Sequence, residues 1–258
     1  MKNKSIIIII TSLIIVIISC YFFFCKKSNQ ISLTVGMMNG WAPFMNINNK
    51  GNMEGFDVDV VKEIEKIINQ KIIIKDLGSL SSLFIALEQE SVVAIFSGLD
   101  VTAKRKTAYD YVLYGSNETK INECCVIINN KGPNNELDLI NNHYKIGLEA
   151  ATSWESTLNK YPLIQKVYSN SISDMLLQLE QNKIDCFIID PMQCHRLKKN
   201  MPYLKYFVID IDESIKIDGI GIFIKKHNNP IKNLFSNAID ALIKNGQIDT
   251  LIQKWNLA

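Results

Sequence analysis

An alternation of short apolar runs with amphipathic segments constrains the fold of this chain more than any other feature. Runs typical of strands lie at residues 33–36, 71–75, 92–96, 145–149, 165–168, 184–189 and 219–223. Segments with helical periodicity lie at residues 56–68, 82–89, 153–160, 172–182, 191–198, 231–244 and 248–255. Strand–helix–strand order of this kind predicts the α/β class, with parallel sheets covered by helices on both faces.

Two less regular, more polar stretches, residues 114–122 and 210–218, divide this pattern. They flank the second set of strands and helices, so two crossovers would make residues 119–217 a second lobe inserted into the first. The first lobe is then discontinuous, with residues 28–118 and 218–258. Two lobes joined by two strands form a hinge, and we expect the hinge to close over a ligand.

One stretch, SGLDVTAKR at residues 97–105, carries ligand-binding chemistry. It follows a buried strand and enters a turn that begins a short helix at Thr102. Free N–H groups at such a junction, together with the guanidinium of Arg105, suit a small carboxylate. Taken alone, the stretch is also typical of a capped helix with a surface arginine. Ser97 and Thr152 both follow strands, at the sheet edge where ligands of α/β proteins bind.

Composition excludes several classes of partner. The chain has 258 residues, 47% hydrophobic and 21% charged, which suits one large domain or two small ones. The net charge is +2, and the sequence has no basic tract interleaved with aromatic residues, so we expect no nucleic-acid partner. The three histidines are scattered, and no CxxC pair accompanies them. We therefore expect no metal site and no cofactor.

The first 27 residues are predicted to target or anchor the chain. Two lysines precede an apolar run at residues 6–19, as in a secretory signal. The run ends in IISC, which resembles the lipobox of bacterial lipoproteins and makes Cys20 the lipid attachment site. Because apolar residues continue to Cys25, residues 5–25 could instead span a bilayer uncleaved. Either anchor holds the remainder outside the cytoplasmic membrane, in the periplasm or at the cell surface.

The six cysteines do not form an evident disulfide framework. Cys124 and Cys125 are adjacent in a predicted strand, so they point to opposite faces and do not easily serve one bridge. Cys186 and Cys194 are isolated. We expect buried small apolar side chains at these four positions, and a disulfide between Cys124 and Cys186 stays open.

A series of motifs resembles those of the family 3 extracellular solute-binding proteins, the amino-acid receptors of ABC importers. The motifs are LTVGMMNGWAPF (33–44), GNMEGFDVDVVKEI (51–64), SGLDVTAKRK (97–106), GLEAATSW (147–154), LEQNKIDCFIID (179–190), GIGIFIKK (219–226) and IDALIKNGQIDTLIQKW (239–255). The resemblance implies a two-lobe type II periplasmic-binding-protein fold with mostly parallel sheets and a two-strand hinge. It also implies that the closed protein delivers a free amino acid to a membrane permease. We expect a monomer.

The resemblance assigns five ligand-binding residues to the first lobe. It implies that Trp41 packs its ring against the ligand side chain, although core packing is the alternative. It implies that Ser97 and Gly98 meet the ligand ammonium, and that Asp100 and Arg105 grip the head of the amino acid, with Arg105 as the carboxylate fork. Asp100 stands where the family more often has Ser or Thr, and a carboxylate there should attract the ammonium.

The second lobe supplies the other side of the site. The resemblance implies that Thr152 and Ser153 open a helix whose N–H groups complete carboxylate binding, which is compatible with a plain N-cap. It implies that Asp190 pairs with the ammonium. It also implies that Glu149 lines the side-chain pocket, where an acid favours a basic ligand.

Three departures from the family pattern bear on the ligand. Met38 stands where receptors for basic amino acids often have an acid, Leu80 replaces a second aromatic wall, and Ala151 replaces the usual glycine before the helix. Met38 and Leu80 favour a more apolar pocket, whereas Asp100 and Glu149 favour a cation. We therefore expect a polar or basic L-amino acid.

Two other functions are known among proteins that this chain resembles in fold. Some proteins of this fold are cyclohexadienyl dehydratases acting on prephenate or arogenate, and here Glu149 or Asp190 would be the general acid. A ligand-sensing module is the other alternative. The sequence has no GxSxG, HExxH or Walker A pattern, so we expect a binding protein and not an enzyme.

Overall fold

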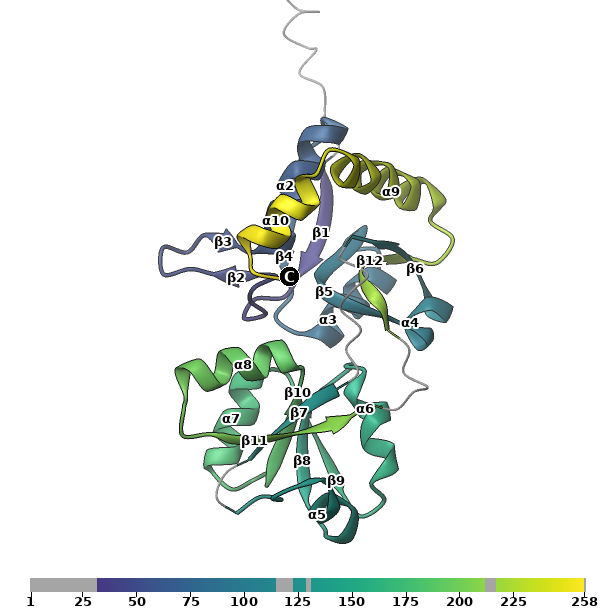
Figure 1. Ribbon diagram of the computed structural model, residues 1–258. Helices are drawn as coiled ribbons and strands as arrows, with labels where there is room; N and C mark the ends of the chain where they lie inside the picture. Colours follow the sequence, from purple (N-terminus) through teal and green to yellow (C-terminus); the bar gives the residue numbers. More distant parts are fainter. Residues whose placement is uncertain (1–31, 115–122, 129–130, 212–216, 258) are drawn as a thin grey trace, which may run out of the picture. The chain divides into compact units, whose positions relative to one another are not determined.

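The computed structural model describes residues 32–114, 123–128, 131–211 and 217–257. Their strands form two five-stranded sheets and a two-stranded hairpin (Figure 1). Helices pack on both faces of each large sheet, which confirms the predicted α/β class and the two-lobe fold.

The first lobe is built on a sheet of order β4-β1-β5-β12-β6. The strands are β1 (Leu33–Met37), β4 (Ile72–Asp76), β5 (Ala94–Thr102), β6 (Tyr109–Leu113) and β12 (Ile217–Lys225), with the hairpin β2 (Asn46–Ile47) and β3 (Met53–Glu54) beside them. The helices are α2 (Phe56–Ile68), α3 (Leu80–Glu88), α4 (Ala103–Ala108), α9 (Asn229–Lys244) and α10 (Gln247–Lys254). One core lies between the sheet and α2, α9 and α10, and the other lies under α3.

The second lobe is built on a sheet of order β11-β7-β10-β8-β9. The strands are β7 (Glu123–Ile128), β8 (Lys145–Glu149), β9 (Gln165–Ser169), β10 (Cys186–Ile189) and β11 (Lys205–Asp210). The helices are α5 (Glu136–Asn141), α6 (Trp154–Thr157), α7 (Ile172–Glu180) and α8 (Pro191–Asn200), and the 3₁₀ helix η1 (Leu158–Lys160) follows α6. One face packs against α5, α6 and η1, and the other against α7 and α8.

Strand β7 shows how the sequence divides its side chains between the two faces. Cys124 and Val126 belong to the core under α5 and α6, whereas Cys125 and Ile127 belong to the core under α7 and α8. Successive side chains of a strand point to opposite faces, so an unbroken apolar run is needed where both faces are buried. The prediction that the adjacent cysteines face opposite sides is confirmed.

The expectation that the sheets are parallel is only half right. In the first sheet β1 pairs in parallel with β4 and β5, but β12 is antiparallel to both β5 and β6. In the second, β8 pairs in parallel with β9 and β10, but β7 is antiparallel to β10 and β11. A simple strand–helix–strand repeat predicts parallel neighbours, whereas β7 and β12 are each flanked by strands running the opposite way.

Strand β5 is longer than the sequence predicts. The buried run was expected to end near Phe96 and to leave a turn, but the strand continues through Asp100 to Thr102. Strand β12 pairs with this extension, with Ile220 opposite Asp100 and Gly221 opposite Leu99. The backbone groups expected to be free in a loop therefore lie in a ladder. The predicted helix after Thr102 is present as α4, and Thr102 caps it.

The lobe boundaries stay a prediction. The first sheet draws its strands from residues 33–113 and 217–225, and the second from residues 123–210. The connecting segments, 115–122 and 212–216, lie outside the described residues, and so does most of the predicted two-strand hinge.

The predicted anchor, residues 1–27 with Cys20, also lies outside the described residues. Within the part of the chain that the structure describes, no helix is both long and apolar enough to cross a membrane.

The structure decides against the disulfide between Cys124 and Cys186 that the sequence left open. The antiparallel register places Cys186 opposite Ile128, four residues from Cys124, which is about 13 Å along the strand. A disulfide requires α-carbons within about 7 Å. All four cysteines of the described segments are buried free thiols, as expected for small apolar side chains.

Candidate functional site

A cavity of about 440 Å³ lies between the lobes and is lined by residues from both. It brings together eight of the nine predicted ligand-binding residues: Trp41, Gly98, Asp100, Arg105, Glu149, Thr152, Ser153 and Asp190. Ser97 is the exception. The remaining wall is largely apolar and includes Met38 and Leu80, two of the positions where the sequence departs from the family pattern.

Arg105 is held in place by aromatic rings and backbone carbonyls. Its guanidinium carbon lies 5.3 Å from the ring centre of Phe84 and 5.8 Å from that of Phe223. Nη1 donates to the Asp100 carbonyl at 2.8 Å, and Nη2 donates to the Ala151 carbonyl of the second lobe at 3.0 Å. A guanidinium has five N–H groups, so these bonds orient the head and leave other donors for a carboxylate.

Gly98 occupies a position that only glycine fits. Its φ of +57° is left-handed, and an added Cβ would lie 2.4 Å from the ring of Phe44. Its N–H donates to Oδ2 of the fully buried Asp57 at 2.8 Å, and Oδ1 of Asp57 accepts from the Tyr114 hydroxyl at 2.6 Å. Burial raises the pKa of Asp57 to about 7, although these two bonds act to lower it. The main chain at the cavity wall is thereby fixed from within the first lobe.

Ser97 and Trp41 differ in their relation to the cavity. Ser97 is fully buried, and its hydroxyl accepts the Met38 N–H at 3.0 Å, so this side chain supports the cavity wall instead of lining the cavity. Trp41 lies half-buried in the turn after β1 and lines the cavity. It also packs against both first-lobe cores, so ring stacking on a ligand and core packing are compatible at this position.

Asp100 meets the second lobe across the cavity. Its Oδ2 accepts from the Ser153 hydroxyl at 3.4 Å. Burial raises the pKa of Asp100, while the charge of Arg105 and the bond from Ser153 act to lower it. The carboxyl therefore faces both a fixed cation and the opposite lobe.

Glu149 and Asp190 bring two more carboxyls to the cavity, at the ends of β8 and β10. Burial, and then the charge of Asp190, raise the pKa of Glu149 to about 8. Burial also raises the pKa of Asp190 to about 6, with the charge of Asp100 adding to it. Glu149 Oε1 and Asp190 Oδ2 are buried without a hydrogen-bond partner among the described residues. Such oxygens need donors or a cation, because an unpaired buried acceptor costs about 1–3 kcal/mol.

The turn before α6 uses its donors internally. Both the N–H and the hydroxyl of Thr152 donate to the Glu149 carbonyl, at 3.4 and 2.8 Å. Ala151 has a φ of +67°, in the left-handed region where glycine is favoured, and this closes the turn. Ser153 directly precedes α6, which is only four residues long. The Thr152 donors thus bond to the backbone of Glu149 and hold it in position. The sequence had predicted that they bind a ligand carboxylate.

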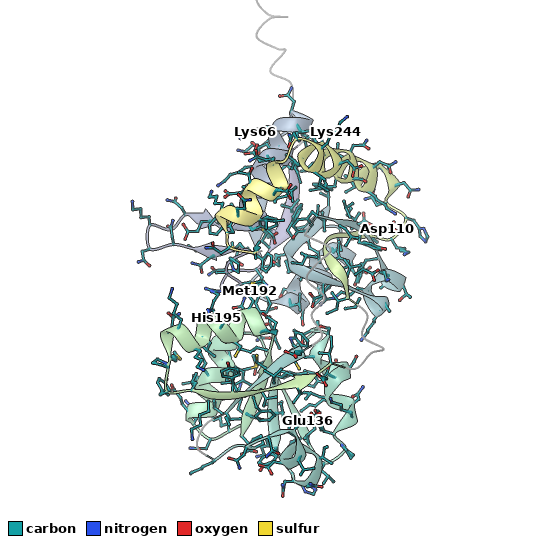
Figure 2. The ribbon with its side chains drawn as sticks, in the orientation of Figure 1. Lys66, Asp110, Glu136, Met192, His195 and Lys244 are labelled. Carbon is teal, nitrogen blue, oxygen red and sulfur yellow. The ribbon has the colours of Figure 1, made fainter. Side chains whose placement is uncertain are left out.

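Sequence reasoning missed several cavity residues. The largest omission is the start of α8, where Pro191, Met192 and Gln193 all line the cavity. Met192, labelled on α8 in Figure 2, packs against the first-lobe core. The signal was present, because these residues directly follow Asp190, which caps α8 by accepting the Gln193 N–H at 2.8 Å.

Comparison with known proteins decides the family. The model for bacterial extracellular solute-binding proteins, family 3, matches residues 33–258. The chain belongs to this family. This solute-binding protein is therefore extracytoplasmic by its family, as the sequence predicts, and the family consists of binding proteins and not enzymes. The dehydratase alternative gains no support from the match.

Individual relatives of the solute-binding protein are distant but extend over most of its length. A probable ABC transporter arginine-binding protein of Chlamydia trachomatis is 22% identical over 230 residues, which is 89% of this chain and 88% of the relative. A probable histidine-binding protein of Campylobacter jejuni is 26% identical over 230 residues, 88% of this chain and 86% of the relative. A Salmonella typhimurium periplasmic binding protein described for its high arginine specificity matches with a TM-score of 0.75 at 22% identity, over 87% of this chain and 98% of that one. This last likeness supports the two-lobe fold.

Proposed function

We propose that the protein binds a basic L-amino acid outside the cytoplasmic membrane and delivers it to an ABC-type permease when the lobes close. The observation that carries this proposal is the set of carboxyls around the cavity. The carboxyls of Asp100, Glu149 and Asp190 line it, together with the exposed carboxyl of Glu123 and one guanidinium, that of Arg105. A ligand with one carboxylate and two cationic groups matches that arrangement.

The head of the amino acid occupies the side of the cavity next to Arg105. The oriented guanidinium donates two N–H groups to the ligand carboxylate, which accepts them as a bidentate partner. The ammonium lies between Asp100 and Asp190, whose carboxyls are close enough for their charges to interact. Trp41 covers the ligand side chain, as the family resemblance implies.

The basic side chain reaches Glu149. Its charged end satisfies the unpartnered Oε1 of this residue, and its aliphatic stem packs against apolar wall residues such as Met38 and Leu80. A long basic side chain has both parts, so the acidic and the apolar features of the pocket select the same ligand class. The relatives named above as arginine- and histidine-binding proteins agree with this class.

The proposed movement follows from the lobe division. Residues 28–118 and 218–258 act as one rigid lobe, residues 119–217 act as the other, and the two segments joining them act as the hinge. A permease can distinguish liganded from free protein only if the ligand binds the closed state more tightly than the open one. We propose that a monomer carries out this cycle.

The N-terminal segment tethers the protein to the membrane in this proposal, by lipid on Cys20 or by an uncleaved apolar helix. Incorporation of radiolabelled palmitate separates the two arrangements. The lipid tether predicts that Cys20→Ala abolishes incorporation. Label that survives in Cys20→Ala contradicts lipid attachment at Cys20, and a parent protein without label favours the uncleaved helix.

A thermal-shift panel tests the ligand class. The full-length protein in detergent is screened against the twenty L-amino acids, ornithine and cystine. A ligand at 100 times its dissociation constant stabilises the folded state by about 2.7 kcal/mol, which is readily seen as a rise in melting temperature. We expect the largest rise with arginine, lysine, ornithine or histidine. A largest rise with an acidic or an apolar amino acid contradicts the proposed class.

A further inference from the structure

The carbonyl of Ala42, in the turn after β1, is bonded differently from those around it. The other four carbonyls of residues 41–45 accept backbone N–H groups of the first lobe at 2.8–3.1 Å. The Ala42 carbonyl instead accepts from two side chains of α8, in the second lobe. A turn that otherwise satisfies its own carbonyls thus presents one acceptor to the opposite lobe.

Two side chains on one face of α8 fill that acceptor. Gln193 Nε2 donates to the Ala42 carbonyl at 2.8 Å, and Arg196 Nη1 donates to the same oxygen. Arg196 Nη1 also lies 3.2 Å from Gln193 Oε1, so the two side chains brace each other. They are three residues apart, which places them on the same side of the helix. A carbonyl oxygen has two lone pairs, and these two donors use both.

An apolar contact lies beside the polar ones. Met192, one residue before Gln193, packs against the first-lobe core. Gln193 is 5% exposed, so its bond to Ala42 is shielded from water and is stronger than a surface bond. The first turns of α8 therefore contact the first lobe through an apolar side chain, a buried amide and a guanidinium.

We propose that Gln193 and Arg196 form a latch on the Ala42 carbonyl that stabilises the closed arrangement of the lobes and thereby sets ligand affinity. The bonds of the latch join protein groups only. Their free energy therefore contributes to the free energy of lobe closure in the same way for every ligand. The apparent affinity of a protein that must close to bind scales with the stability of its closed state. Arg196 is not among the cavity-lining residues, so it acts as a positioning residue.

The latch is also attached to the site. The Gln193 N–H is held by Asp190, the carboxylate proposed to receive the ligand ammonium. Ala42 directly follows Trp41, which is proposed to cover the ligand side chain. The latch contacts and the ligand contacts thus involve the same helix, α8, on one lobe and the same turn on the other. Formation of either set of contacts therefore favours formation of the other.

Arg196→Ala in the full-length protein in detergent is the test. Interlobe distance is followed by single-molecule fluorescence transfer between labels at the exposed positions 66 and 183. Affinity and rates are measured with L-arginine, or with whichever amino acid gives the largest thermal shift. We expect longer interlobe distances in the free protein and about tenfold weaker affinity, from a faster dissociation rate with little change in association.

Three further variants make the test specific. Lys199→Ala removes the same charge from an exposed position of α8 and should match the parent, whereas Arg196→Lys keeps a donor and should recover part of the affinity. Gln193→Leu removes the other donor at similar volume and gives an independent test if Arg196→Ala does not fold. Distances and dissociation rates in Arg196→Ala or Gln193→Leu that equal those of Lys199→Ala would overturn the latch.

The affinity measurement rests on the proposed function, because it needs an amino-acid ligand. The distance measurement on free protein does not. If no amino acid binds the parent protein, the proposed function fails, and the latch is still decided by the interlobe distances.

Discussion

The two sides of the cavity carry similar polar groups but use them differently. On the first lobe, the main chain that shapes the cavity wall is bonded within that lobe: Asp57 accepts the Gly98 N–H, and Ser97 accepts the Met38 N–H. On the second lobe, Glu149 Oε1 and Asp190 Oδ2 are buried with no partner in the described segments. The first-lobe side is a preformed surface, whereas the second-lobe side has carboxyl oxygens that are available to bind a ligand.

This difference indicates how binding and closure are coupled. The first-lobe side can receive the head of the ligand while the lobes are apart, because its main chain is fixed by bonds within that lobe. The bonds from Arg105 to Ala151 and from Ser153 to Asp100 cross between the lobes. The second side contributes only when closure brings its carboxyls to the ligand. The ligand therefore gains the free energy of its contacts with Glu149 and Asp190 only in the closed state. A ligand that binds the closed state more tightly than the open one shifts the equilibrium toward closure.

Loss of Arg105 should have the largest effect, because it removes the anchor of the preformed side. In Arg105→Ala the ligand carboxylate is left desolvated and unpaired, and we expect a loss of about 3–4 kcal/mol, several hundredfold in affinity. Titration calorimetry with L-arginine measures it. Lys104→Ala, an exposed charge on the same helix, is the control and should bind like the parent. Parental affinity in Arg105→Ala would remove Arg105 from the site.

Glu149 should make binding depend on pH. With a pKa of about 8 in the free protein, its carboxyl is protonated near pH 6 and must lose that proton to pair with a cation. Affinity for L-arginine should therefore rise between pH 6 and 8, by up to about tenfold per unit, with protons released on binding. Calorimetry in buffers of different ionisation enthalpy measures both quantities.

The variant Glu149→Gln should lose this part of the pH dependence and bind about 10–100-fold more weakly at pH 8. Glu123→Gln alters an exposed carboxyl on the same cavity and should keep the dependence. An equal slope in the parent and in Glu149→Gln would show that Glu149 does not meet the ligand cation.

Substitution of Asp57 should change the unfolding free energy, because this residue holds the main chain of the preformed side in place. Asn at this position offers only one acceptor oxygen for the two donors, Tyr114 and Gly98, so we expect Asp57→Asn to cost about 2 kcal/mol of unfolding free energy. The folded-state pKa of about 7 exceeds the ordinary 3.8, so protonation favours the folded protein. That contribution is complete below pH 3.8 and is lost as pH rises through 7.

Denaturant unfolding at pH 4, 5.5, 7 and 8 measures this contribution. The difference in stability between the parent and Asp57→Asn should change across that interval, because only the parent carries the titrating carboxyl. A difference that is constant from pH 4 to 8 would mean that Asp57 does not titrate in the folded state.

Ala151 should give the smallest effect, on the second side. Its φ of +67° costs an alanine about 1 kcal/mol that glycine does not incur, partly offset by the greater chain entropy of glycine. We expect Ala151→Gly to raise the unfolding free energy by about 0.5 kcal/mol. Ala150→Gly, at an ordinary backbone conformation, should lower it by a similar amount. A loss in both variants would contradict the strained turn.

Much of the fold can be predicted from the sequence, because it follows from the local pattern of apolar residues. Helix α2 has the bounds that its apolar periodicity predicts, Phe56–Ile68, and β8 has those of its apolar run, Lys145–Glu149. The extension of β5 to Thr102 was not predictable locally, because it depends on pairing with β12, more than a hundred residues later. Strand β11 was missed because its alternation is weak and most of it is exposed.

The site divides in the same way. The chemistry-bearing residues Asp100, Arg105, Glu149 and Asp190 follow from their positions near strand ends and from the family resemblance. The partners of individual hydrogen-bond donors cannot be predicted in this way, because the backbone conformation of the turn determines which groups the Thr152 donors reach. Asp57 looks like an ordinary acid in a first helical turn until Gly98, 41 residues away, is seen to donate to it. Gln193 and Ala42 are 151 residues apart.

A comparison of L-arginine with L-citrulline by titration calorimetry tests the central claim most directly. The two ligands have the same head and nearly the same shape, but only arginine carries a side-chain charge. If the second-lobe carboxyls receive a cation, arginine should bind the parent protein at least about 100-fold more tightly, and Glu149→Gln should remove most of that preference. Citrulline binding as tightly as arginine, or a preference unchanged in Glu149→Gln, would contradict the account.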